Sequence, residues 1–111
     1  MATVKATDVY LKRVRRLLSP AEQEAFHRHL AAHPDVGDIV AGTGGVRKVR
    51  WGMTGQGKRG GVRALHLYLR HKDTVWLLDI YAKREKTDLT PDDVRAVRQL
   101  VQAIKAMEGR T

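Results

Sequence analysis

Basic side chains at the ends of three expected strands have the types and spacing of a phosphate-binding cluster. Lys48 and Arg50 share one face of their strand, because strand side chains alternate between faces, and Arg63 opens the next strand. Such cations can stabilise the charge that develops when an RNA 2′-hydroxyl attacks its own phosphate, without metal. Arginine suits the clamping role, and lysine that of a point charge or proton donor. The six cations in question are Lys48, Arg50, Arg63, Lys83, Arg84 and Lys86.

The charge of the chain indicates an anionic partner. Its 111 residues include 21 Lys and Arg against 12 Asp and Glu, a formal net charge of +9 at pH 7. Contacts between such a protein and phosphate groups give a salt-sensitive affinity, so nucleic acid is the expected class of partner. An anionic membrane surface would need an amphipathic helix with an exposed apolar face, and every such face in this sequence is better used as core.

Length and composition exclude several classes of protein. A chain of this length suits one domain, residues 1–111, that needs no disulfide or metal to fold. The absence of cysteine excludes disulfide scaffolds and thiolate zinc sites and favours a reducing, cytoplasmic setting. No apolar run is long enough to span a membrane, and the N-terminal MATVKATD lacks the layout of a signal peptide.

Other kinds of site are less well supported by residue spacing. Three histidines within residues 27–33 lack the glutamate of a zincin motif, so they are expected on a helix surface. The glycine-rich segment 55–61 does not match a Walker loop, because its lysine is followed by an arginine and a strand. Ser19, the only serine, is expected to cap a helix. Asp79 is expected to pair with an arginine, and His66 to be a structural histidine.

Two short helices are expected near the N-terminus and one long helix at the C-terminus. Thr7 caps the first helix, and Ser19, followed by proline and by Glu22, forms a capping box for the second. The second helix should end before Pro34. One face of the first helix is expected to be solvated and carries Lys12, Arg13, Arg15 and Arg16. Thr90 caps the last helix, whose apolar stripe is Val94, Val97, Leu100, Val101, Ile104 and Met107.

The strands predict the fold class. Residues 46–51 alternate as a strand does, and residues 62–70 and 74–82 are apolar segments joined by a short polar turn. The latter two segments are typical of an antiparallel hairpin in the middle of a sheet, and Val4 can belong to an edge strand. The order of elements indicates an α+β domain with a small, mostly antiparallel sheet, two N-terminal helices and a C-terminal helix across the sheet.

Three blocks of sequence closely resemble one family. Read in order, GDIVAGTGGVRKVRW (37–51), GQGKRGGVRALHLYL (55–69) and LLDIYAKREKTDLTPDD (77–93) resemble the HigB-type branch of the RelE/ParE toxin superfamily. The resemblance spans about the whole chain after Ser19. It implies the RelE-like microbial ribonuclease fold and a toxin of a bacterial type II toxin–antitoxin pair that cleaves mRNA in the ribosomal A site, with no metal and no cofactor.

The resemblance also implies the partners of the protein. Its substrate complex would be the 70S ribosome with bound mRNA, in the cytoplasm and away from any membrane. A helix-turn-helix antitoxin encoded beside the toxin would silence it, and the toxin would be a monomer within that complex.

Site residues follow from the resemblance, position by position. Arg63 matches the family's strand-opening arginine, which stabilises the transition state. With Arg63, the catalytic candidates are Lys48, Lys83 and Lys86. The remaining cations are candidates for binding RNA phosphates: Arg47, Arg50, Lys58, Arg59 and Arg84. The family's tyrosine is replaced here by Thr90, and Tyr81 can substitute for it if its side chain reaches the concave face.

Three alternatives stay open at this point. A non-nuclease toxin of the ParE branch would inhibit DNA gyrase and leave mRNA intact. A degenerate member would only bind its antitoxin or RNA, and single Arg63→Ala and Lys83→Ala changes would then leave growth unaffected. A basic strand face can also be merely solvated or bind phosphate without specificity.

Overall fold

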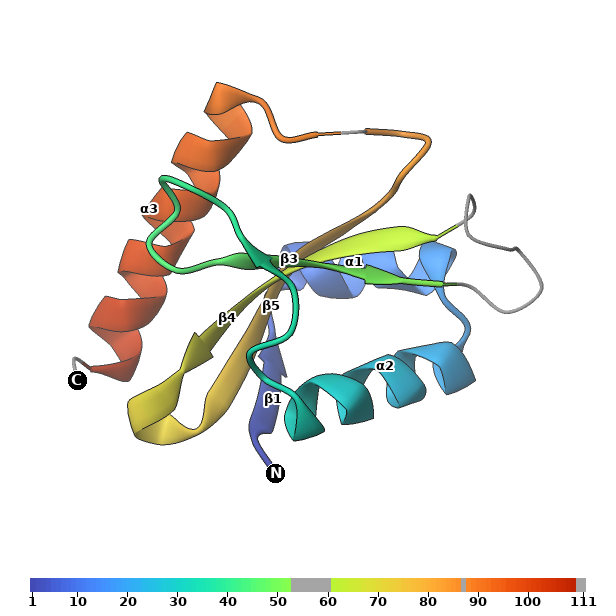
Figure 1. Ribbon diagram of the computed structural model, residues 1–111, viewed down its shortest axis with the longest axis horizontal. Coiled ribbons are helices and arrows are strands. Elements are labelled where there is room, and N and C mark those ends of the chain that lie inside the picture. The colour runs from blue at the N-terminus through green and yellow to red at the C-terminus, as the bar shows by residue number, and fades with distance from the viewer. Residues whose placement is uncertain (53–60, 87, 110–111) are drawn as a thin grey trace.

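Among the described residues, a five-stranded sheet lies between α3 on one face and the pair α1 and α2 on the other (Figure 1). The computed structural model describes residues 1–52, 61–86 and 88–109. The strand order is β1-β5-β4-β3-β2, and only the β1–β5 pair is parallel, so the predicted α+β class is confirmed. In chain order the elements are β1 (Thr3–Ala6), α1 (Asp8–Leu17), α2 (Pro20–Ala32), β2 (Asp38–Ile39), β3 (Arg47–Trp51), β4 (Val62–Leu69), a 3₁₀ turn (Arg70–Lys72), β5 (Thr74–Ala82) and α3 (Pro91–Glu108).

Local capping residues start α1 and α2 where the sequence predicts. The Thr7 hydroxyl accepts a hydrogen bond from the Tyr10 N–H at 3.2 Å and so satisfies a free donor of the first turn. Ser19 and Glu22 exchange side-chain and backbone hydrogen bonds of 2.8 and 3.2 Å, which is the predicted capping box. Helix α2 ends at Ala32, ahead of the proline that would disrupt it.

Helix α3 buries most of the predicted apolar stripe. Val97, Val101 and Ile104 are buried against the sheet. Met107 is 67% exposed, so its predicted place in the core was wrong, and Glu108 is buried instead. The reason is that the last turn of α3 faces polar partners rather than the apolar core. Neither α3 nor any other helix within the described ranges is long and apolar enough to cross a membrane.

Two apolar clusters occupy the two faces of the sheet. Helices α1 and α2 cover one face with a cluster formed by Tyr10, Val14, Leu18, Phe26, Leu30, Val49, Val62, Ala64, Leu77 and Ile80. Helix α3 covers part of the other face with a cluster formed by Val46, Leu65, Leu67, Leu69, Leu78, Val97, Val101 and Ile104. The sheet is therefore a central layer between helices. On the part of its face that α3 does not cover, the strands fix where the side chains lie.

A β-bulge in the central hairpin changes which β5 side chains face α3. Leu65 lies opposite Asp79 and His66 lies opposite Leu77, so β5 has one extra residue, Leu78, at this point. Leu78 packs in the α3 cluster, and Asp79 faces the same side because its partner Leu65 does. The bulge therefore places an acid on the α3 side of the sheet.

Short strands complete both edges of the sheet. Val4 lies in β1, which confirms the predicted edge strand. The two-residue strand β2 was not predicted, because its only signal is one pair of residues beside β3. Gly37, just before β2, has φ +97°, and a Cβ atom there would lie 2.6 Å from the Lys48 carbonyl oxygen. Only glycine lets the chain approach β3 this closely.

The buried carboxylate of Glu108 links the C-terminal end of α3 to three other elements by hydrogen bonds. Glu108 accepts hydrogen bonds from the Lys5 ammonium at 3.0 Å, the Trp76 indole at 2.8 Å and the Lys72 ammonium at 3.5 Å. The hydrogen bond from Lys5, followed by that from Trp76, lowers the pKa of Glu108 from 4.5 to about 2. The ionised carboxylate therefore stabilises the folded chain at neutral pH.

Replacing this carboxylate should cost stability only where it is ionised. Because the pKa of Glu108 is lower in the folded chain, its contribution is complete above about pH 4.5 and is lost as pH falls to about 2. Glu108→Gln is expected to lower Tm by about 5 °C at pH 7, and the two proteins should converge near pH 2. Thermal melts across this range measure the difference, with Glu24→Gln in an exposed ion pair as the control. A constant difference at all pH values would contradict the assignment.

Candidate functional site

Strand pairing brings Arg50, Arg63 and Tyr81 into one row. Arg50 of β3 lies opposite Arg63 of β4, and Arg63 lies opposite Tyr81 of β5. Directly opposite side chains of antiparallel strands share a face, so these three side chains lie together on the α3 side of the sheet. Lys48 lies two residues before Arg50 on the same face. The structure thus brings together three of the predicted site cations, with Tyr81 beside them.

Arg63 is buried and has no carboxylate partner among the described residues. Its side chain is 9% exposed, and its guanidinium donates one long hydrogen bond of 3.4 Å to the neighbouring Val62 carbonyl oxygen. No aspartate or glutamate of the described chain forms an ion pair with it. A buried arginine normally has such a partner, since an uncompensated buried charge is costly. The position of Arg63 therefore favours an external anion.

Tyr81 provides a second unsatisfied polar group beside Arg63. Its side chain is 6% exposed, and its hydroxyl is buried with no hydrogen-bond partner within the described structure. Burial raises the pKa of the Tyr81 phenol above its ordinary value of 10.0, while the charge of Arg63 opposes that rise. The phenol is therefore protonated at neutral pH and available as a hydrogen-bond donor.

Two lysines flank this pair, and each is held by an aspartate. The Lys86 ammonium lies 5.8 Å from the centroid of the Tyr81 ring and 3.0 Å from an Asp93 carboxylate oxygen. Asp93 also accepts the Thr90 N–H at 2.9 Å as part of the capping box of α3. That backbone hydrogen bond, followed by the one from Lys86, lowers the pKa of Asp93. The start of α3 therefore places Lys86 over Tyr81, and Lys48 similarly lies 3.8 Å from Asp88.

The remaining predicted site cations are exposed, lie on the other side of β3, or fall outside the described residues. The Lys83 N–H donates to the Gly61 carbonyl oxygen at 3.3 Å, but its side chain is exposed, as is that of Arg84 in the same turn. Arg47 alternates with Lys48 and donates to the Gly37 carbonyl oxygen at 2.9 Å, on the other side of β3. Arg47 therefore faces away from Arg63, while the roles of Lys83 and Arg84 stay predictions. Lys58 and Arg59 lie outside the described residues.

The histidines have structural contacts. His66 is fully buried and its Nε2 lies 2.8 Å from the Val36 carbonyl oxygen, while burial lowers its pKa, so it is neutral at pH 7. His27 Nε2 lies 2.9 Å from the Tyr10 hydroxyl. No group of three or more His, Asp or Glu side chains that could hold a metal ion comes together in the parts of the chain described above.

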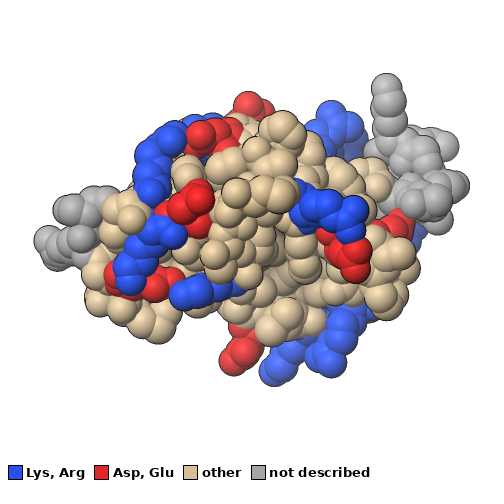
Figure 2. Space-filling model, turned by 90° about the horizontal axis from the view of Figure 1, so that it is seen from below, with Lys and Arg blue, Asp and Glu red and all other residues tan. Residues whose placement is uncertain are grey.

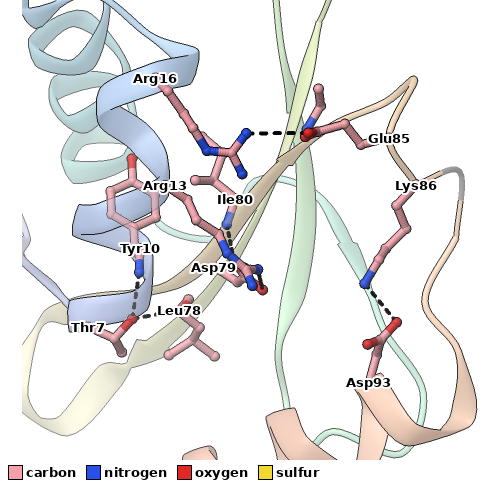
Figure 3. A network of polar contacts seen from close by, with 11 residues as sticks. Thr7, Tyr10, Arg13, Arg16, Leu78, Asp79, Ile80, Glu85, Lys86 and Asp93 are labelled. Carbon is pink, nitrogen blue, oxygen red and sulfur yellow. Dashed lines mark hydrogen bonds and ion pairs between the residues drawn. The ribbon is translucent and has the colours of Figure 1, made fainter.

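Helix α1 contributes both basic partners of two ion pairs near the site, and sequence reasoning did not identify either of these partners. The Arg13 guanidinium donates to both carboxylate oxygens of Asp79 at 2.8 and 2.9 Å, and Arg16 lies 3.3 Å from Glu85 in the turn after β5 (Figure 3). The prediction that Asp79 pairs with an arginine is confirmed. The partner was unpredictable, because the two residues lie 66 positions apart and the basic face of α1 resembles a solvated one.

On the face seen in Figure 2, the surface charge does not form one continuous basic patch. On this face, lysine and arginine side chains lie next to aspartates and glutamates, with uncharged surface between the groups. Exposed pairs of this kind contribute little to stability. Arg63 and Tyr81 differ from them because both are buried, and within the described ranges Arg63 forms no ion pair and the Tyr81 hydroxyl has no hydrogen-bond partner.

Comparisons with known proteins agree with this fold. Residues 23–111 match the family model described as the RelE toxin of the RelE/RelB toxin–antitoxin system. Isolated E. coli RelE superposes with a TM-score of 0.57 at 14% identity, over 90% of this chain and 99% of that one. A variant of E. coli RelE in the free state gives 0.58 at 14%, over 89% and 96%. The intact E. coli RelBE complex gives 0.54 at 14%, over 72% and 94%. The chain therefore belongs to the RelE toxin family.

Proposed function

We propose that this protein is a ribosome-dependent endoribonuclease that cleaves mRNA, as the toxin of a type II toxin–antitoxin pair. The observation that carries the proposal is Arg63, buried beside the unpaired Tyr81 hydroxyl with no carboxylate partner in the described chain. A guanidinium with one long hydrogen bond and an adjacent phenol with none suit an anion with several oxygens, and a phosphodiester is such an anion. Three sequence blocks support the HigB branch of the superfamily.

In the proposed reaction the RNA supplies its own nucleophile. The 2′-oxygen forms a bond with phosphorus while the bond between phosphorus and the 5′-oxygen breaks. The 2′-hydroxyl gives its proton to solvent water and the leaving 5′-oxygen takes one from solvent water, so the protons balance. Arg63 donates two hydrogen bonds to the non-bridging oxygens, where charge develops. Tyr81 donates a third, and Lys48, Arg50 and Lys86 hold the flanking backbone. The products are a 2′,3′-cyclic phosphate and a 5′-hydroxyl.

The partners follow from the same proposal. The 70S ribosome presents the mRNA, and the toxin acts in the cytoplasm as a monomeric unit of residues 1–111. Its neutralising partner is a helix-turn-helix antitoxin, as the E. coli RelBE complex makes an antitoxin the expected partner. The side chains proposed for catalysis need no metal and no cofactor, because guanidinium and phenol groups supply the transition-state hydrogen bonds.

Cleavage of mRNA on programmed ribosomes tests the function. Wild-type protein with ribosomes, mRNA and EDTA is expected to produce cuts in the A site that end in a 2′,3′-cyclic phosphate. The same mRNA without ribosomes is the matched control and should stay intact. Uncut message on ribosomes overturns the proposal, and inhibition of gyrase supercoiling with intact message would favour a ParE-like toxin instead.

A further inference from the structure

Carboxylates near the site are each held by a cation other than Arg63. Asp79 pairs with Arg13 of α1, and Asp93 pairs with Lys86 (Figure 3). The other two pairs are Glu85 with Arg16 and Asp88 with Lys48. Arg63 is the most buried of these cations, and it is the one that forms no ion pair within the described structure. The pairing pattern therefore leaves the charge of the central arginine uncompensated.

Asp79 is the carboxylate that strand pairing places nearest to Arg63. Asp79 lies opposite Leu65 and Tyr81 lies opposite Arg63, so Asp79 and Arg63 are diagonal neighbours on adjacent strands. Diagonal neighbours lie about 7–8 Å apart, which a long arginine side chain can span. Both charges also act on the Tyr81 phenol, since Asp79 raises its pKa and Arg63 lowers it. A change of side-chain conformation would suffice to bring Asp79 to Arg63.

The contacts of Arg13 oppose this movement of the Asp79 side chain toward Arg63. One guanidinium nitrogen of Arg13 donates to both oxygens of Asp79, at 2.8 and 2.9 Å, in a charge-assisted contact that is stronger than a neutral hydrogen bond. The Ile80 N–H donates to the same carboxylate at 2.7 Å from the backbone side. Figure 3 shows Arg13 reaching from α1 to Asp79 of β5, so the Asp79 carboxylate is directed toward Arg13.

We propose that Arg13 is a positioning residue that holds Asp79 away from Arg63 and so keeps Arg63 available for a phosphate group of the RNA substrate. This inference rests on the proposed function. Stability alone does not account for the pair, because both side chains are partly exposed and exposed ion pairs contribute little. The bulge places Asp79 on the α3 side of the sheet, the side that also carries Arg63. Without Arg13, the carboxylate of Asp79 would be available to neutralise the charge of Arg63.

Removal of the two charges, singly and together, separates this role from a merely structural one. Arg13→Gln releases Asp79 to pair with Arg63, so kcat on programmed ribosomes is expected to fall about tenfold with KM little changed. Asp79→Asn alone leaves Arg63 unpaired and should remain active. The double variant Arg13→Gln/Asp79→Asn should recover the activity of Asp79→Asn, because no carboxylate is left to compete. Arg70→Gln, which also breaks an ion pair between elements, is the matched control and should behave as wild type.

Binding of inorganic phosphate gives a readout that does not require cleavage. NMR of the Arg63 Nε–H group is expected to detect phosphate in wild type, weaker binding in Arg13→Gln and restored binding in the double variant. An Arg13→Gln protein that binds phosphate as wild type does overturns the inference, as does a double variant that stays impaired. If wild type fails to cut mRNA but the phosphate series follows this order, the proposed function fails and the role of Arg13 stands.

Discussion

Replacement of Arg63 by methionine is expected to lower kcat for cleavage of ribosome-bound mRNA by roughly a thousandfold. The guanidinium is buried beside the row of site cations and Tyr81, and it donates only one long hydrogen bond within the described structure. Its hydrogen bonds are thus reserved for the phosphorane, where loss of one preorganised donor costs about a hundredfold to a thousandfold. KM should change little, because other contacts bind the ground state.

The same substitution should leave the fold intact or stabilise it. Methionine has an unbranched apolar side chain that fills the space of the arginine stem, and Arg63→Met leaves no orphaned carboxylate, since Arg63 has no acidic partner in the described chain. Thermal melts should therefore show an unchanged or raised Tm. Arg50→Met, on the opposing strand and exposed, is the matched control and should mainly weaken RNA affinity and its salt dependence. Full toxicity of Arg63→Met in a growth assay would refute the assignment.

Features with a local cause could be predicted from the sequence. Thr7, Ser19 and Thr90 act as helix caps because each needs only its own side chain and the next turn. The central hairpin follows from apolar segments separated by a polar turn. The alternation of residues 46–51 correctly placed Lys48 and Arg50 on one face of β3. The sequence is thus enough to predict which site residues share one face of a strand.

Features that depend on register and distant contacts could not be predicted. The bulge at Leu78 moves Asp79 to the α3 side, and no local pattern shows where pairing shifts by one residue. Arg13 has the same sequence context as its solvated neighbours, although it binds Asp79 across 66 positions. Lys83 and Lys86 were both predicted in the site because they follow β5, and the sequence could not show that Lys86 turns back over Tyr81; the role of Lys83 stays a prediction.

Tyr81 is expected to contribute to catalysis at the expense of stability. Its buried hydroxyl has no partner in the described structure, and a buried polar group without a hydrogen bond costs about 1–3 kcal/mol. Tyr81→Phe removes that cost and keeps the ring beneath Lys86. We expect Tm to rise by roughly 4 °C for each kcal/mol recovered in a chain of this size.

The same substitution should lower the rate of mRNA cleavage while it raises Tm. If the hydroxyl donates to the phosphorane, Tyr81→Phe lowers kcat about a hundredfold with little effect on KM. Tyr68→Phe is the matched control, because the Tyr68 hydroxyl donates to Asp73 at 2.7 Å, so its loss should slightly lower Tm and leave cleavage unchanged. A Tyr81→Phe protein that is more stable and fully active would mean that the unpaired hydroxyl is a packing defect, whereas gain of stability with loss of rate is the behaviour of a donor kept for its substrate.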